Sequence, residues 1–554
     1  MIAQPHWFGP SRSLFGMLHT PSGGLRGAVV VCPPLGYEAV GSYATLRRVA
    51  ERLASLGIAC LRIAYPGMGY GPADQPGTDQ LPVWRSAIGD AASELRSMGA
   101  TWVGVVGLRF SATLAAEATA DGGFDALVAW DPVVNGRRYA RAMKMLSAHT
   151  DRDATSDGVT LAGAEFAPPT LAAMSACAFR QPDGAPALVL QRSEASIEAS
   201  LAERGVPVVQ VEGTAAMLDV DAELSVVPHE IVDRITEWLD LQAPAAMAAA
   251  ATLPSPVAST VHHSDLALRR DAVRIGRSQL FAMLTRADAA TPEHAVLFLN
   301  NGASFAIGPG GAWIDWAEEV ARLGGLAVQV DVSGLGESPT VAGGAEQQVY
   351  SAVSAQNLTD VAAFLRARGI RQITTVGLCS GAFLALDAVV AGAAIDHVVA
   401  VNARVDKPFT DTRRVPRSAG HTNRFLALPL SKSPLFPTLD KVPTWAWRLL
   451  ARAHLVAAPT VALRRALLCG ARVTLLFGTQ EWGLRALEHR DPDTWEAIRR
   501  HPRMAVAVLA DLDHSMFEPA GRAAVEAYLR THVWPTVTPT LTPQPSESST
   551  EVIA

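Results

Sequence analysis

A long internal repeat restricts this chain to folds that can occur twice. The segment SRSLFGMLHTP in the first half returns as GRSQLFAMLTR in the second, and each copy precedes an apolar run. Phe15 and Phe281 lie 266 residues apart, and Gly107 and Gly377, in two similar turns, lie 270 residues apart. A nearly constant offset over this distance indicates two homologous halves.

Both halves alternate helices and strands in the same order. The hydrophobic pattern predicts a helix over residues 44–56 followed by a strand over 59–64, and again a helix over 313–323 followed by a strand over 327–330. Repeated units of this kind form a mostly parallel sheet with helices on both faces. We therefore predict an α/β fold with one such domain in each half.

Composition sets the expected domain limits. A stretch at residues 243–262 that is rich in Ala and Pro is typical of a linker, so the domains are expected at 1–242 and 263–532. A long insert at about 403–468 is expected to form a lid on the second domain. The tail, 533–554, is rich in Pro, Ser and Thr and is expected to be disordered. We expect the homologous domains to pack on each other.

The charge pattern argues against nucleic acid as a partner. The 554 residues carry a net charge of −6, and basic and acidic residues are interspersed without a basic stripe. The N-terminus lacks a secretion signal, and no apolar segment reaches the roughly 18 residues that a membrane span needs. We expect a cytoplasmic protein with no membrane span.

Cysteine usage indicates a reducing compartment. The cysteines are odd in number, widely spaced and free of any C-x-x-C pair; they are Cys32, Cys60, Cys177, Cys379 and Cys469. This pattern argues against a disulfide framework and against a zinc site. We expect neither a bound metal nor a cofactor.

Cys379 lies in the most informative motif. The sequence GLCSG, with Cys379 at its centre, connects a predicted strand over 373–376 to an amphipathic helix. Such a turn lifts the central side chain clear of the sheet, and Gly377 and Gly381 are needed because the two backbone segments nearly touch. The start of a helix also favours a thiolate. We predict a nucleophile; the alternative is a small buried residue, as most free cysteines are.

Two backbone N–H groups would stabilise the oxyanion formed when Cys379 attacks a carbonyl. The N–H of Ser380, at the helix start, is the first expected donor. The second must come from the loop after an earlier strand, where the N–H of Gly302 or Ala303 is the candidate.

These motifs resemble the α/β-hydrolase superfamily over nearly all of both halves outside the linker and the tail. NNGASFAIGPGGAWIDWAEEVARLGG, DVSGLGES and GLCSGA resemble one of the two hydrolase families found beside bacterial exosortase A systems, and WDPVVNG and GLRFSATLA resemble the other. A cysteine at the centre of this strand-to-helix turn, which is called the nucleophile elbow, is similar to that of dienelactone hydrolases and polyhydroxyalkanoate synthases. That resemblance implies a covalent acyl-enzyme, which water hydrolyses in one case and an alcohol accepts in the other.

The resemblance also implies a base and an orienting acid, in the chain order nucleophile, acid, histidine. Glu481 follows the predicted strand of VTLLFGTQEWG, and His514 follows that of VAVLADLDHSMF. We predict a triad of Cys379, Glu481 and His514. Asp511 or Asp513 could orient the histidine in place of Glu481.

The predicted lid combines aromatic side chains with arginines: Phe409, Phe425, Phe436, Trp445, Trp447, Arg404, Arg413, Arg414 and Arg417. This mixture suits an apolar acyl pocket with an anion-binding mouth, as a thioester of coenzyme A or of a carrier protein would require. The alternative is that the aromatic side chains only pack the lid onto the core.

The first half lacks most of this machinery. Arg109 occupies the nucleophile position, and a guanidinium cannot attack a carbonyl. The acid position reads QRSE, and Ala215 aligns with His514. We predict a pseudoenzyme domain, in which Arg109 either binds a carboxylate or phosphate at the helix N-terminus or is a relic. His229 comes too late to be the base and is expected at the start of a helix.

The sequence therefore predicts an acyl-transfer enzyme that forms a thioester on Cys379 from a small-molecule ester or thioester and hydrolyses it. A thioester keeps more acyl energy than an ester, so an acyltransferase that uses an amine, alcohol or thiol is the second possibility. The third is a non-catalytic scaffold made of two binding modules.

Overall fold

The computed structural model describes residues 3–534 except 72–76, 151–157, 194–200, 202–206, 246–258, 264–265, 342–343, 345, 352, 404–458 and 491. The predicted lid, with all of the aromatic residues and arginines named for it, therefore lies almost entirely outside the described residues.

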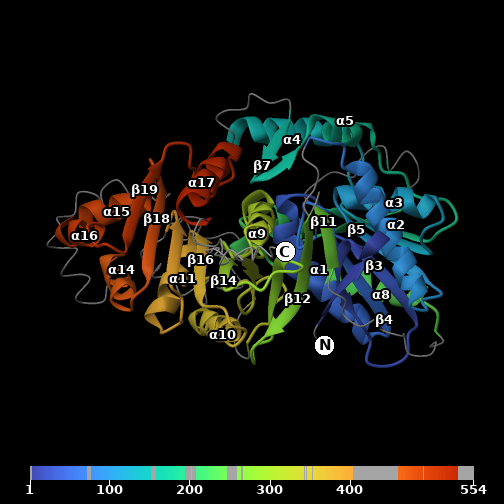
Figure 1. Cartoon of the computed structure of the whole chain (residues 1–554). Helices are drawn as coiled ribbons and strands as arrows, with labels where there is room; N and C mark the ends of the chain where they lie inside the picture. The colour runs from blue at the N-terminus through green and yellow to red at the C-terminus, as the bar shows by residue number, and fades with distance from the viewer. Residues whose placement is uncertain are drawn as a thin grey trace, which may run out of the picture.

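Two sheets of the same design lie side by side in the molecule (Figure 1). The first has eight strands in the order β1-β2-β4-β3-β5-β6-β9-β10, and the second has nine in the order β11-β12-β13-β15-β14-β16-β17-β18-β19. Antiparallel strands form one edge of each sheet, and the strands from β4 to β10 and from β15 to β19 are parallel. The predicted α/β fold with a mostly parallel sheet in each half is confirmed.

The strands are short and mostly apolar. Those of the first sheet are β1 (Gln4–Phe8), β2 (Leu14–His19), β3 (Gly27–Cys32), β4 (Ile58–Ala64), β5 (Val103–Leu108), β6 (Ala126–Trp130), β9 (Ala187–Arg192) and β10 (Val208–Val211). Those of the second are β11 (Ser259–His263), β12 (Leu266–Ile275), β13 (Leu280–Ala287), β14 (His294–Leu299), β15 (Leu326–Val330), β16 (Gln372–Leu378), β17 (His397–Val401), β18 (Arg472–Gly478) and β19 (Met504–Leu509). A separate hairpin comprises β7 (Val159–Leu161) and β8 (Ala164–Phe166).

Helices cover both faces of the first sheet because its strands are apolar on both sides. Alternate residues of β3 point to opposite layers, so that Val29 packs with α1 (Tyr37–Ser55) and α8 (His229–Gln242), whereas Val30 packs with α2 (Leu81–Ser97) and α3 (Phe110–Ala120). The other helices among the described residues of this half are α4 (Gly136–Thr150), α5 (Pro168–Ala176), α7 (Thr214–Leu218) and the short η1 (Pro10–Arg12) and η2 (Ala222–Leu224).

The second sheet is covered in the same way. One face packs against α9 (Ala312–Arg322) and α17 (Pro519–His532), and the other against α10 (Ser354–Arg366), α11 (Ser380–Val390) and α14 (Pro459–Leu468). In the part of the chain that the structure describes, this half also contains η3 (Pro309–Gly311), α15 (Trp482–Arg490) and α16 (Pro492–Arg499).

The antiparallel edges of the two sheets contact each other. A shared apolar cluster joins Trp7, Phe15 and Tyr70 of the first half to Phe281 and Phe305 of the second. The Phe15 and Phe281 rings, which the sequence repeat makes equivalent, have their centroids 6.3 Å apart. Burial of apolar side chains from both halves in one cluster stabilises their association.

Two segments differ from the expected limits. Strand β11 starts at Ser259, inside the predicted linker. Val533 and Trp534 begin the segment expected to be disordered, yet both are buried, and the Trp534 ring packs edge-on against Phe298. Burial of a large aromatic ring offsets the entropy lost by ordering the chain end. Residues 535–554 lie outside the described part of the chain.

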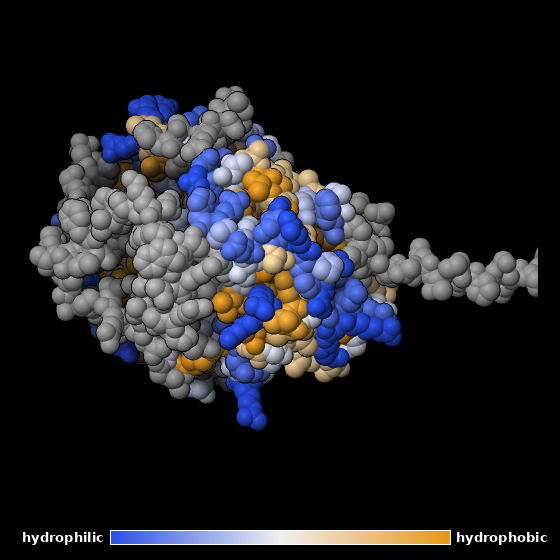
Figure 2. Space-filling view, turned by 90° about the vertical axis from the view of Figure 1, so that its left-hand side faces the viewer, coloured by the Kyte–Doolittle hydropathy of each residue, from blue (hydrophilic) through white to orange (hydrophobic). Residues whose placement is uncertain are grey.

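Figure 2 shows the side of the molecule where the second sheet ends, with hydrophobic residues scattered among hydrophilic ones. The exposed apolar side chains of this region include Val461, Leu468 and Val508, the last of which lies on the edge strand β19. Within the described ranges, no helix combines the length and the hydropathy that a bilayer span requires.

Candidate active site

Cys379 lies between the end of β16 and the start of α11. Its backbone has φ 51° and ψ −106°, a conformation that a non-glycine residue adopts only when its surroundings impose it. The Cys379 N–H donates a hydrogen bond of 3.0 Å to the Val401 carbonyl of the neighbouring strand, which holds the turn against the sheet. The thiol is half-buried.

The glycines on either side of Cys379 are close to other backbone atoms. A Cβ added to Gly377 would lie 2.4 Å from the Gly381 carbonyl carbon, and one added to Gly381 would lie 2.5 Å from the Asn300 carbonyl oxygen. Backbone cannot move away as a flexible side chain can. The tight turn therefore depends on the absence of both side chains.

We expect Gly377→Ala to lower the free energy of unfolding by about 1–3 kcal/mol, because the new methyl group overlaps the first turn of α11. Urea denaturation measures the change. Gly89→Ala in α2 is the matched control, because a Cβ there meets no atom within 4 Å, and it should be neutral or slightly stabilising. Equal stability of Gly377→Ala and the wild type would show that the turn relaxes easily.

His514 and Glu481 lie on the loops that follow β19 and β18. The Nδ1 atom of His514 is 2.9 Å from Oε2 of Glu481. Glu481 has 8% of its side chain exposed and His514 has 49%. A buried carboxylate beside a half-exposed imidazole is positioned to fix the tautomer and orientation of the ring.

The pKa of His514 is raised to about 10, first by a hydrogen bond with the Cys379 thiol and second by the hydrogen bond with Glu481. Because Nδ1 is directed to Glu481, Nε2 is the atom left for the thiol. The structure therefore brings Cys379, His514 and Glu481 together where β16, β18 and β19 end, with a hydrogen bond between His514 and Glu481. A histidine that retains its proton at this position can later donate it to a leaving group.

The two other acids considered from the sequence have different positions. The Asp513 carboxylate accepts hydrogen bonds from the backbone N–H groups of Ser515, Phe517 and Glu518, so that it shapes the loop. Among the described residues, no hydrogen bond joins Asp511 to the His514 ring, which is bonded to Glu481. Glu481 is the acid that the structure places at the ring.

Asn402 is a positioning residue that the sequence reasoning missed. Its Nδ2 donates to the main-chain oxygens of Asp513 and His514, at 2.8 and 3.0 Å, and its Oδ1 accepts from the Gly478 N–H. It therefore ties the histidine loop to the end of β18. Alignment of VNARV with WDPVV of the first half would have drawn attention to this polar residue directly after the strand.

The expected oxyanion donors are not equivalent. Ser380 begins α11, and the first N–H groups of a helix have no acceptor within it. The Gly302 N–H instead donates to the Ser380 Oγ at 2.8 Å, because the hydroxyl lies directly over the loop. Ala303 is buried beside Gly302. In this conformation the N–H of Ser380 and of Ala303 are the better candidates, and Gly302 supports the loop.

A segment of the first half lies next to the loop that contains Gly302. A Cβ on Gly302 would lie 2.4 Å from Oε1 of Glu223, which belongs to η2. The neighbouring Ala222 N–H donates to the Tyr37 hydroxyl at 3.1 Å, and the Tyr37 ring packs edge-on against Phe517. Local sequence patterns could not have indicated these contacts, because they join residues far apart in the chain.

The equivalent turn of the first half has the same backbone but different chemistry. Arg109 has φ 58° and ψ −124°, close to Cys379. Its guanidinium forms ion pairs with Glu38, at 2.9 Å, and Asp131, at 3.0 Å. Arg192 pairs with the same Asp131 at 2.8 Å. Charged side chains therefore occupy the position where the second half has Cys379, His514 and Glu481, and the carboxylates around Arg109 oppose an added anion.

The first half also lacks a base at the positions that could correspond to His514. Ala215 lies in the short helix α7, and His229 is the first residue of α8, as expected of a helix-start residue. Among the described residues, no group of three or more His, Cys, Asp or Glu side chains could hold a metal ion.

The strand order and the sharp turns after β5 and β16 define an α/β-hydrolase fold in each half. No family model and no curated protein matches the chain. Among solved structures, it is similar to Est1E of Butyrivibrio proteoclasticus with ferulic acid bound, at 16% identity over 42% of this chain and 98% of that one, with a TM-score of 0.34.

Two further solved structures have a similar level of likeness. An α/β serine hydrolase without a lid from Xanthomonas campestris is 14% identical over 44% of this chain and 94% of its own, with a TM-score of 0.29. The esterase Pf2001 of Pyrococcus furiosus is 11% identical over 50% of this chain and 97% of its own, with a TM-score of 0.31.

Proposed function

We propose that this chain is an acyl-transfer enzyme that hydrolyses a small-molecule ester or thioester through a covalent thioester on Cys379. The observation that carries the proposal is the gathering of Cys379, His514 and Glu481 at a strained strand-to-helix turn, with Nδ1 of His514 2.9 Å from Oε2 of Glu481. A nucleophile, a base within reach and an acid that orients the base are the parts that acyl transfer needs.

In the proposed reaction, the Cys379 thiolate attacks the carbonyl carbon, and the carbonyl oxygen becomes an oxyanion near the start of α11. The bond to the leaving group then breaks, and the leaving oxygen or sulfur takes the proton that His514 holds. Water next loses a proton to His514 and attacks the thioester. The carbon–sulfur bond breaks, the acid is released, and the Cys379 thiolate and the protonated His514 are restored.

Mass spectrometry of the intact protein and of its proteolytic peptides tests the first step. The full chain is incubated with acetyl coenzyme A or p-nitrophenyl acetate and quenched in acid, and the expected result is one acetyl group on the peptide that contains Cys379. An unmodified peptide at every time point, with no product released, would favour the scaffold of two binding modules.

The cysteine in place of the commoner serine favours a second candidate, transfer of the acyl group to an amine, alcohol or thiol. A thioester retains more acyl energy, so added nucleophiles can compete with water. If the ratio of transferred to hydrolysed product rises with the nucleophile and exceeds that of the uncatalysed reaction, the enzyme is an acyltransferase. If the ratio of transferred to hydrolysed product does not change with the concentration of the nucleophile, the enzyme is a hydrolase.

Glu481→Gln should lower kcat by roughly 10²–10⁴-fold, because the neutral amide orients the imidazole less well and no longer stabilises its charge. His514 has a pKa of about 10 and must hold a proton for the leaving group, so activity should fall as pH rises through about 10. In Glu481→Gln this alkaline limb should move to lower pH. Profiles of kcat/KM against pH measure the shift, with the exposed Glu488→Gln as the control.

A further inference from the structure

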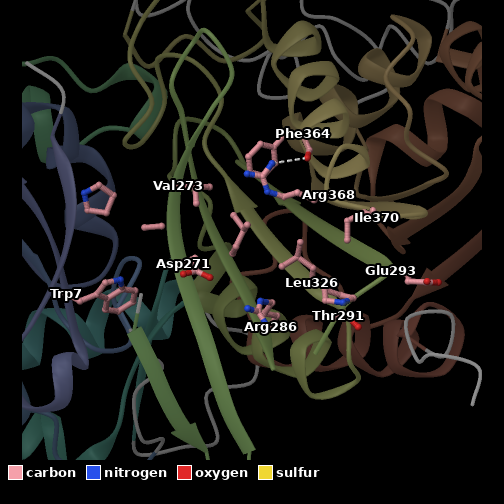
Figure 3. Close-up of a pocket in the computed structure, with 15 residues that line it drawn as sticks. Trp7, Asp271, Val273, Arg286, Thr291, Glu293, Leu326, Phe364, Arg368 and Ile370 are labelled. Atoms are coloured by element: carbon pink, nitrogen blue, oxygen red, sulfur yellow. Dashed lines mark hydrogen bonds between the residues drawn. The ribbon is translucent and has the colours of Figure 1, made fainter. Parts of the chain in front are cut away.

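A cavity of about 600 Å³ lies at the end of the second sheet opposite Cys379 (Figure 3). Glu293 and Ile370 of its wall come just before β14 and β16, and Leu326 is the first residue of β15. Cys379 directly follows the other end of β16. A strand of this length separates its ends by about 20 Å, so the cavity is distinct from the candidate active site.

The wall of the cavity is largely apolar. Val273, Leu284, Leu326, Phe364 and Ile370 contribute to it, and Leu326 and Ile370 are almost fully buried. The volume is within the range of about 300–1,000 Å³ that small-molecule sites occupy. This part of the wall is suited to the hydrocarbon or aromatic body of a ligand.

Two arginines add positive charge to this apolar wall. Arg286 lies on β13 and Arg368 follows the end of α10, and in Figure 3 Leu326 lies between them. Arg286 donates through one Nη atom to the carbonyls of the 287–290 turn. Arg368 lies over the Phe364 ring at 3.5 Å. Neither guanidinium forms an ion pair with the described residues, so both charges are available to a ligand.

The carboxylates of the cavity do not cancel these charges. Asp271 accepts hydrogen bonds from Arg269 at 3.0 and 3.2 Å. Glu293 pairs with Arg371 at 3.4 Å. Each carboxylate is paired with an arginine outside the wall, so that neither is held by Arg286 or Arg368.

We propose that this cavity binds a small amphipathic anion, with a carboxylate or phosphate held by Arg286 and Arg368 and an apolar body against Leu284 and Leu326. Guanidinium groups recognise both anions through paired N–H donors. Pro5 and Trp7 of the first half also line the cavity, so that a bound ligand contacts both halves. The site is separate from the acyl chemistry proposed for Cys379.

The experiment measures binding of octanoate and octyl phosphate to the full chain by isothermal titration calorimetry, with octanol as the neutral probe. We expect saturable binding of one anion per chain and at least tenfold weaker binding of octanol. In Arg286→Gln/Arg368→Gln the dissociation constant of the anion should rise at least tenfold. The tighter of the two anions identifies carboxylate or phosphate as the recognised group.

Two controls keep this result interpretable. Arg500→Gln removes an exposed arginine that does not line the cavity and that forms a surface ion pair with Glu496. This variant should bind the anion as the wild type does. If loss of the Arg286 hydrogen bonds unfolds the double variant, Arg368→Gln alone should still weaken binding at least threefold. Unchanged affinity in the arginine variants, or equal affinity for octanol, would overturn the proposal. Cys379→Ala protein should bind equally well, which separates this result from that for the acyl chemistry.

Discussion

Cys379→Ala is expected to lower kcat/KM for ester or thioester hydrolysis by about 10⁴–10⁶-fold, because the acyl-enzyme cannot form without the sulfur. The residual rate would come from substrate binding and the oxyanion donors. The fold should persist, since the side chain is small and the turn is held by Gly377, Gly381 and the bond to the Val401 carbonyl. Initial rates measured with chromogenic esters and acyl thioesters give the size of the effect.

Cys469→Ala is the matched control for this variant. Cys469 is exposed, whereas Cys32, Cys60 and Cys177 are buried, so that iodoacetamide should label Cys379 and Cys469 in the wild type. Loss of activity should follow the labelling of Cys379 and not that of Cys469. If Cys379→Ala retains the wild-type rate, or labelling of Cys379 leaves activity intact, the cysteine is not the nucleophile.

Arg62→Met is expected to lower the free energy of unfolding by about 3–5 kcal/mol, because it leaves a buried carboxylate without its cation. Arg62 of β4 contacts Glu337 of the second half through one Nη atom at 2.7 and 2.8 Å, and the two side chains are only 6% and 1% exposed. After the change, the Tyr43 hydroxyl would still donate to the Glu337 carboxylate. Urea denaturation followed by tryptophan fluorescence measures the loss.

A double-mutant cycle distinguishes this loss from simple repacking. Arg62→Met combined with Glu337→Gln should be less destabilising than the sum of the two single changes, by at least about 1 kcal/mol, because the neutral amide costs less to bury. Arg371→Met, which removes the cation of an exposed pair with Glu293, should have little effect. Strict additivity of Arg62→Met and Glu337→Gln would show that the two side chains do not interact.

The sequence predicted the parts of this molecule that depend on local pattern. The repeat of the Phe15 and Phe281 segments indicated two sheets of one kind, and the glycines around Cys379 indicated a turn too tight for side chains. The spacing after predicted strands gave Glu481 and His514, which the structure places 2.9 Å apart. The catalytic role of these residues remains a prediction that the experiments above test.

Contacts between distant segments could not be predicted in the same way. The pair of Arg62 and Glu337 and the approach of Glu223 to Gly302 depend on how one half is placed against the other. Trp534 looked like part of a polar tail because its neighbours are polar, and only the three-dimensional packing shows the apolar site that it fills. Periodicity and spacing describe segments, whereas these features arise from surfaces that meet.

The similar backbones of Arg109 and Cys379 provide an internal reference within one molecule. Both turns have φ between 50° and 60°, although only one carries a side chain capable of attack. A strained turn is therefore maintained where no nucleophile exists, and its conformation follows from the sheet and the helix that it joins. Any reactivity that belongs to the turn alone should be shared by both positions, whereas reactivity confined to residue 379 must come from the side chains gathered around it.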